Sequence, residues 1–192
     1  MCRLFVQLVK PEQALRAAEG ALNIYPGSYK LHALLAELQS DAGDPQAALH
    51  TASLALALAP TASLAPTGSA IADSPASADL PDSADLTAVV GLRRLFVYNL
   101  EQVGAWEMAL QERLALLAGL TSPAIDELLG LARCALHAAK PAQALQACRQ
   151  ALEIDPENEP ALGLSAQVAL DLGEPAAAID YLHRAICQSP HL

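Results

Sequence analysis

Aromatic side chains are scarce in this sequence: Phe, Trp and Tyr together make up 4% of it, although hydrophobic residues make up 53%. The difference is filled mostly by Ala and Leu, two of the strongest helix-forming residues. Residues branched at Cβ, which favour strands, are few. The composition therefore predicts an all-α protein, and 192 residues are enough for one ordinary domain or one short repeat array.

Basic residues are also in short supply, with 11 Lys and Arg against 21 Asp and Glu and a formal net charge of −10. A nucleic-acid-binding protein needs a basic face to displace counterions from phosphates, and an anionic membrane attracts the same kind of face. Arg93 and Arg94 are the only adjacent bases. We therefore expect no nucleic-acid partner, and we expect a protein partner with a basic or neutral surface.

Long apolar runs are absent, so no segment is expected to insert into a membrane. The apolar stretch within residues 1–9 has no clear small-residue cleavage site after it and does not have the features of a signal peptide. Four cysteines are present, namely Cys2, Cys134, Cys148 and Cys187. Because they follow no disulfide or zinc spacing, we expect reduced thiols, no metal site and a cytoplasmic protein.

Signatures of catalysis are missing as well, since the sequence contains no G-x-S-x-G, P-loop or G-x-G-x-x-G motif. Cys134 and His137 lie three residues apart on a predicted helix and face the same way. A metal site, however, needs three or four converging ligands. The sequence therefore predicts that the chain is not an enzyme and binds no cofactor.

What the sequence does contain is an internal repeat, in which small and turn-forming residues recur at an interval of 34 residues. The recurring pairs are Ala14 and Ala48, Ala21 and Ala55, Pro26 and Pro60, Ala144 and Ala178, Ala151 and Ala185, and Pro156 and Pro190. A glycine lies five residues before an alanine in three places: Gly43 before Ala48, Gly104 before Ala109, and Gly173 before Ala178. A fixed period of this length is the signature of a helical repeat architecture.

This period, with Gly, Ala and Pro at constant offsets, resembles the tetratricopeptide repeat family. The resemblance implies hairpins of a helix A and a helix B, stacked into a right-handed α-solenoid of about four and a half repeats. Small residues are needed where the two helices of a hairpin cross: Ala36, Ala132 and Ala166 on helix A, and Ala48, Ala109, Ala144 and Ala178 on helix B. A larger side chain at these places costs about 1–3 kcal/mol.

Proline marks the expected start of four B helices. Pro11, Pro45, Pro141 and Pro175 each lie three residues before a helix-B alanine. Proline suits the first turn of a helix because its missing N–H would have no partner there and its fixed φ is already helical. Trp106 takes the same place in the remaining repeat.

The array is interrupted, because Ala48 and Ala109 are separated by 27 residues more than one repeat length (61 − 34). We predict a half repeat plus one hairpin in residues 1–60, a flexible acidic insertion rich in Ala, Ser and Pro in residues 61–87, and three consecutive hairpins in residues 88–192. The insertion is either a tolerated surface loop or a tether or lid over the binding surface.

In this family, the inner faces of the A helices line a concave groove that holds a peptide or a partner helix. Transferring that face by repeat register gives nine candidate partner-binding residues: Glu37, Asp41, Arg94, Tyr98, Glu101, Arg133, His137, Gln167 and Asp171. Arg and Tyr are enriched at binding hot spots, and Arg can bind a carboxylate through two hydrogen bonds. Tyr98 replaces the Asn of the members that clamp a C-terminal carboxylate, which argues against that particular clamp.

The resemblance thus implies a scaffold or adaptor that binds a peptide or helix of another protein. The alternative is a regulatory or docking domain of a larger enzyme or multi-protein assembly, such as bacterial secretion or envelope machinery. The last hairpin also carries apolar residues at Leu162, Ile179, Leu182 and Ile186. Because repeat arrays need polar ends to stay soluble, this composition favours homo-oligomers formed through the terminal repeats.

Overall fold

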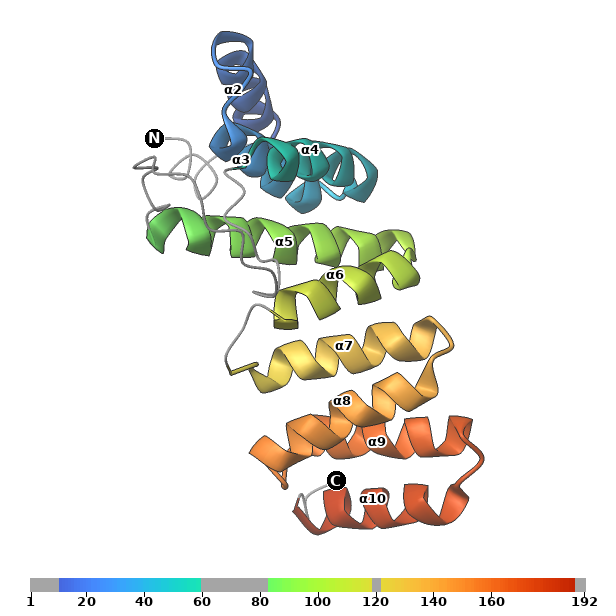
Figure 1. Cartoon of the computed structure of the whole chain (residues 1–192). Helices are drawn as coiled ribbons and strands as arrows, with labels where there is room; N and C mark the ends of the chain where they lie inside the picture. Colours follow the sequence, from blue (N-terminus) through green and yellow to red (C-terminus); the bar gives the residue numbers. More distant parts are fainter. Residues whose placement is uncertain (1–10, 60–82, 119–121, 189–192) are drawn as a thin grey trace, which may run out of the picture. The chain divides into compact units, whose positions relative to one another are not determined.

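The computed structural model describes residues 11–59, 83–118 and 122–188, and within these segments all regular structure is helical. The helices are α2 (Pro11–Ile24), α3 (Tyr29–Asp41), α4 (Pro45–Leu58), α5 (Ser83–Val103), α6 (Trp106–Ala118), α7 (Ile125–His137), α8 (Pro141–Ile154), α9 (Glu159–Asp171) and α10 (Pro175–Gln188), shown in Figure 1. The all-α prediction is confirmed. The helix A expected in residues 1–8 lies outside the described residues, as does most of the acidic insertion.

The prolines begin helices where the repeat register placed them. Helices α2, α4, α8 and α10 all start at their proline, and α6 starts at Trp106. At the start of α4, the side chain of Asp44 accepts a hydrogen bond from the backbone N–H of Ala47 over 3.0 Å. This contact satisfies one of the N–H groups that the first turn of a helix leaves without an intrahelical partner.

The chain divides into two compact units, Met1–Ala105 and Trp106–Leu192. The division falls between α5 and α6, the two helices of the hairpin expected after the insertion. Helix α5 begins at Ser83, so that its first turn lies within the segment assigned to the insertion.

In the first unit, α3 and α4 form a hairpin that packs against α2 on one side and α5 on the other. Ala36 and Ala48 are completely buried, as expected for the place where two helices cross closely. Ala52 and Leu92 belong to the apolar cluster that joins α4 to α5, where Leu95 and Phe96 pack against it.

In the second unit, α7 with α8 and α9 with α10 form two successive hairpins, which run back and forth as stacked layers in Figure 1. The small residues at their crossings are all buried: Ala132, Ala144, Ala166 and Ala178. The predicted role of alanine, which is to let two helices approach, is therefore confirmed in both units.

Candidate partner-binding surfaces

The A helices of the first unit, α3 and α5, contact each other and carry five of the nine candidate residues. Glu37 and Asp41 are exposed on α3, and Arg94 and Tyr98 are exposed on α5. Glu101, one turn further along α5, is half-buried. The candidates on each helix are therefore accessible along one face of this unit.

Tyr98 is 51% exposed, although its neighbours Val97 and Asn99 are almost completely buried. A large aromatic side chain normally buries most of its surface in a core. Here the ring stands on the outward face of α5, one turn after Arg94. This residue offers the first unit a large contact area for a partner.

The A helices of the second unit, α7 and α9, also contact each other. Arg133 and His137 are exposed on α7, and Gln167 and Asp171 are exposed at the positions 34 residues later on α9. Opposite charges on neighbouring helices make this surface polar and mixed, as the repeat register predicted for it.

His137 is not a simple groove residue, because its ring stacks on the indole of Trp106. The ring centroids are 4.1 Å apart and the planes differ by 19°. Trp106 is half-buried in the first turn of α6, and His137 is the last residue of α7. The sequence pattern gave each residue a position but not this contact, since 31 residues separate the two.

A charged contact between α6 and α7 was also missed. The Arg113 guanidinium lies 3.3 Å from a carboxylate oxygen of Glu127, and each side chain is only 14% exposed. The guanidinium covers Gly130, where an added Cβ would clash with it. Glycine in a helix interior is unfavourable, so Gly130 was a signal in the sequence that something approaches the backbone there.

Asn99 is a second polar residue in an otherwise apolar place. Its side-chain N–H donates to the carbonyl of Leu95 over 2.9 Å, and its side-chain oxygen has no hydrogen-bond partner among the described residues. The same register position holds Leu38, Cys134 and Val168 in the other repeats, all buried. This exception is visible in the sequence once the repeats are aligned.

The described thiols differ in accessibility, because Cys134 and Cys148 are buried while Cys187 is exposed. Burial raises the pKa of the Cys148 thiol, and a hydrogen bond with Ser165 partly opposes that rise. Within the described residues, no three His, Cys, Asp or Glu side chains converge on a metal position. No helix in that part of the chain is long and apolar enough to cross a membrane.

Comparisons with known proteins agree with this architecture. Residues 135–191 match the family model described as "Tetratricopeptide repeat". No curated protein sequence matches the chain significantly. Among solved structures, the chain is similar to MamA from Desulfovibrio magneticus RS-1, with a TM-score of 0.75 and 13% identity over 98% of this chain and 91% of that one.

Two further structures share the fold. YrrB, described as a TPR protein with an unusual peptide-binding site, has a TM-score of 0.75 and 14% identity over 99% of this chain and 84% of its own. The Pseudomonas aeruginosa protein pilF has a TM-score of 0.60 and 20% identity over 98% and 73%, respectively. Together, the family match at residues 135–191 and the shared fold identify the chain as a helical-repeat protein of the tetratricopeptide repeat family.

Proposed function

We propose that this chain is a non-catalytic scaffold that holds a peptide or helical segment of another protein on the exposed faces of its A helices. The observation that carries the proposal is the exposed ring of Tyr98 beside the exposed side chain of Arg94 on α5. Tyrosine gives a large rigid contact area at a small cost in conformational entropy, and Arg and Tyr dominate binding hot spots.

The charges around Tyr98 indicate what kind of segment fits. Glu37 and Asp41 on α3 present carboxylates, and Arg94 on α5 presents a guanidinium, all on exposed positions. A partner segment that carries both signs of charge would pair with each of them, and a basic one would also be attracted by the net charge of −10. The peptide-binding site described for YrrB, whose fold this chain shares, supports binding of this type.

The test uses a matched pair of double variants in the first unit. Arg94→Glu/Tyr98→Ala changes the proposed surface, and Arg16→Glu/Tyr25→Ala changes the same residue types at exposed positions outside it. Both baits are used to capture proteins from the native cell extract, and the affinity of the captured partner is then measured by calorimetry. We expect at least a tenfold loss for the first variant, equivalent to about 1.4 kcal/mol.

The control variant is expected to bind like the unchanged chain. If the partner binds Arg94→Glu/Tyr98→Ala as tightly as the unchanged chain, the α5 surface is not the binding site and the proposal is wrong. Helical content measured by circular dichroism shows that both variants are folded, which is expected because the four side chains are exposed.

A further inference from the structure

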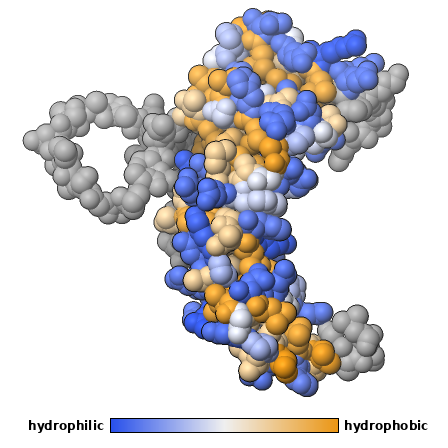
Figure 2. Space-filling model, turned by 90° about the vertical axis from the view of Figure 1, so that its right-hand side faces the viewer, coloured by the Kyte–Doolittle hydropathy of each residue, from blue (hydrophilic) through white to orange (hydrophobic). Residues whose placement is uncertain are grey.

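Helix α10 carries an apolar stripe on its surface, made of Ile179, Leu182 and Ile186, which are 54%, 44% and 63% exposed. Their spacing of three and four residues places them on one face of the helix. Another face of α10 packs against α9 through the buried Ala178. Figure 2 shows apolar surface at the lower end of the view, where α10 lies.

The repeat register shows what covers this face elsewhere in the chain. The residues 34 positions earlier are Leu145, Cys148 and Leu152 on α8, and all three are buried or half-buried where α9 packs on that helix. The corresponding face of α4 is covered by α5. The stripe on α10 is therefore built to receive one more helix, running antiparallel to it.

We infer that this helix is α10 of a second copy of the chain, so that two chains pair through α10 about a twofold axis. The stripe is nearly symmetric along the helix, since Ile179 and Ile186 are equally distant from the midpoint between Leu182 and His183. An antiparallel pair centred there packs Ile179 of each chain against Ile186 of the other. The inference does not depend on the proposed groove.

Charge favours a second α10 over other acidic surfaces as the occupant. Helix α10 carries one acid, Asp180, and one base, Arg184, in a chain whose net charge is −10. A spacing of four residues places both on the same flank of the stripe. The twofold axis brings this flank of one chain beside the same flank of the other, so that each Asp180 faces the Arg184 of the second copy.

Arg184 can serve both its own chain and the second copy. One nitrogen of its guanidinium donates to the carbonyl of Pro156 over 2.9 Å. A guanidinium has five N–H donors in a planar fork, so donors remain for a carboxylate on the outward side.

The first test is sedimentation equilibrium of the full chain under reducing conditions. We expect a concentration-dependent dimer, whose dissociation constant rises at least tenfold in Ile179→Asp/Ile186→Asp. The matched control, Leu54→Asp/Leu58→Asp, adds the same charge at exposed apolar positions of α4 and is expected to dimerise normally. A chain that is monomeric at 1 mM, or a control as weak as the α10 variant, would overturn the inference.

The second test examines the geometry of the pair. Asp180→Lys is expected to weaken the dimer by placing Lys opposite Arg184, and Asp180→Lys/Arg184→Asp is expected to restore it, because the swapped charges again face each other across the axis. If the swap weakens the dimer further than Asp180→Lys alone, the two helices do not pair in this way.

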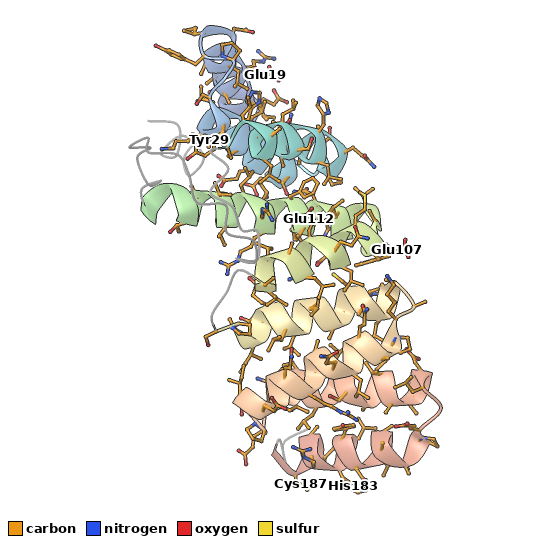
Figure 3. The ribbon with its side chains drawn as sticks, in the orientation of Figure 1. Glu19, Tyr29, Glu107, Glu112, His183 and Cys187 are labelled. Carbon is orange, nitrogen blue, oxygen red and sulfur yellow. The ribbon has the colours of Figure 1, made fainter. Side chains whose placement is uncertain are left out.

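Cysteine cross-linking gives a third, independent reading. In a Cys2→Ser/Cys187→Ser background, His183→Cys lies next to the twofold axis and is expected to form a disulfide-linked dimer on oxidation. The native Cys187, shown with His183 on the outward side of α10 in Figure 3, is not. The helical rise separates the two copies of Cys187 by about 13 Å along the axis, and a disulfide requires Cα atoms within about 7 Å. Cross-linking through Cys187 instead of residue 183 would contradict the pairing.

Discussion

Ala139 shows how much one residue can carry at a helix turn. The turns that join helix A to helix B contain Gly43, Gly104 and Gly173, with φ of 80°, 79° and 76°. In the hairpin of α7 and α8 the same place is held by Ala139, with φ of 56°. Because Cβ crowds the backbone in the left-handed region, this turn is strained where the other three are not.

Replacing Ala139 with Gly is therefore expected to stabilise the chain. The strain of a left-handed non-glycine residue is about 1–2 kcal/mol, and the extra backbone entropy of Gly in the unfolded chain offsets about 0.4–1 kcal/mol of that gain. We expect a net increase of about 0.5–1 kcal/mol in the free energy of unfolding, measured by urea denaturation. Ala138→Gly, at a residue with φ of −80°, is the control and should not stabilise.

The buried thiol of Cys148 makes stability depend on pH. Its pKa is raised by burial in the folded chain, while in the unfolded chain the thiol titrates near its ordinary pKa of about 8.5. Below that pH both states keep the proton and the full stability is present. Above it the unfolded chain loses its proton first, so the free energy of unfolding falls as the pH rises toward the folded-state pKa.

We expect Cys148→Ala to reduce the loss of stability between pH 8 and pH 10, measured as the shift of the urea midpoint under reducing conditions. Alanine occupies the same register position at Ala52, where it is completely buried, so the fold accepts it. Equal losses in the variant and the unchanged chain would show that Cys148 does not contribute to the dependence.

At the scale of elements, the contact of α6 with α7 differs from the other contacts between repeats. Arg113 stands at the register position of Ala52, and Glu127 and Gly130 stand at those of Leu92 and Leu95. An apolar contact is thereby replaced by an ion pair, each side chain of which is 14% exposed, over a glycine that makes room for it. The three residues form one device, since each fits only beside the others.

The effect of Gly130→Ala should therefore depend on Arg113. In the unchanged chain the new Cβ displaces the guanidinium and weakens its contact with Glu127, which cancels or exceeds the helix propensity gain. In an Arg113→Ala background the same substitution meets open space and should stabilise α7 by about 1 kcal/mol. The double-mutant cycle, measured by urea denaturation, is expected to give a coupling of about 1 kcal/mol or more.

Two additive substitutions would show that Arg113 does not occupy the space above Gly130 in solution. As a control, Gly163→Ala adds a Cβ to an exposed glycine of α9 that nothing approaches within 4 Å. It should stabilise the chain in both backgrounds.

This contact also marks the limit of prediction from sequence. Ala48, Ala144 and the first-turn prolines occur at one fixed period, so they determined the repeat fold and the starts of four helices. The pairing of Arg113 with Glu127 breaks that period, and so does the stacking of Trp106 on His137. Side-chain contacts between helices depend on packing that no spacing rule encodes, whereas Gly130 and Asn99, being unusual at their register positions, were visible signals.

The nine candidate residues divide in the same way. Eight are exposed and Glu101 is half-buried, so the repeat register predicted the accessible face of each A helix well. It did not predict that His137 is engaged with an aromatic ring. Which of these residues binds a partner stays a prediction, because accessibility follows from periodicity and affinity does not.

At the scale of the whole molecule, a repeat protein distributes its stability among neighbouring elements. Each helix packs mainly on the helices next to it in the chain, and long-range contacts across the sequence are few in this architecture. A perturbation in one repeat should therefore weaken that repeat and its neighbours and leave distant repeats intact.

Ala166→Leu tests this expectation by hydrogen exchange. Ala166 is 3% exposed where α9 crosses α10, and a leucine there overpacks the crossing at a cost of about 1–3 kcal/mol. We expect amide protection to fall in α9 and α10, to a smaller extent in α8, and not in α2, α3 or α4. Ala36→Leu, the equivalent change in α3, should give the reverse pattern, with the loss confined to the first unit. A uniform loss across both units from either substitution would mean that the chain unfolds as one cooperative body, and that the local stability expected of a solenoid does not apply to it.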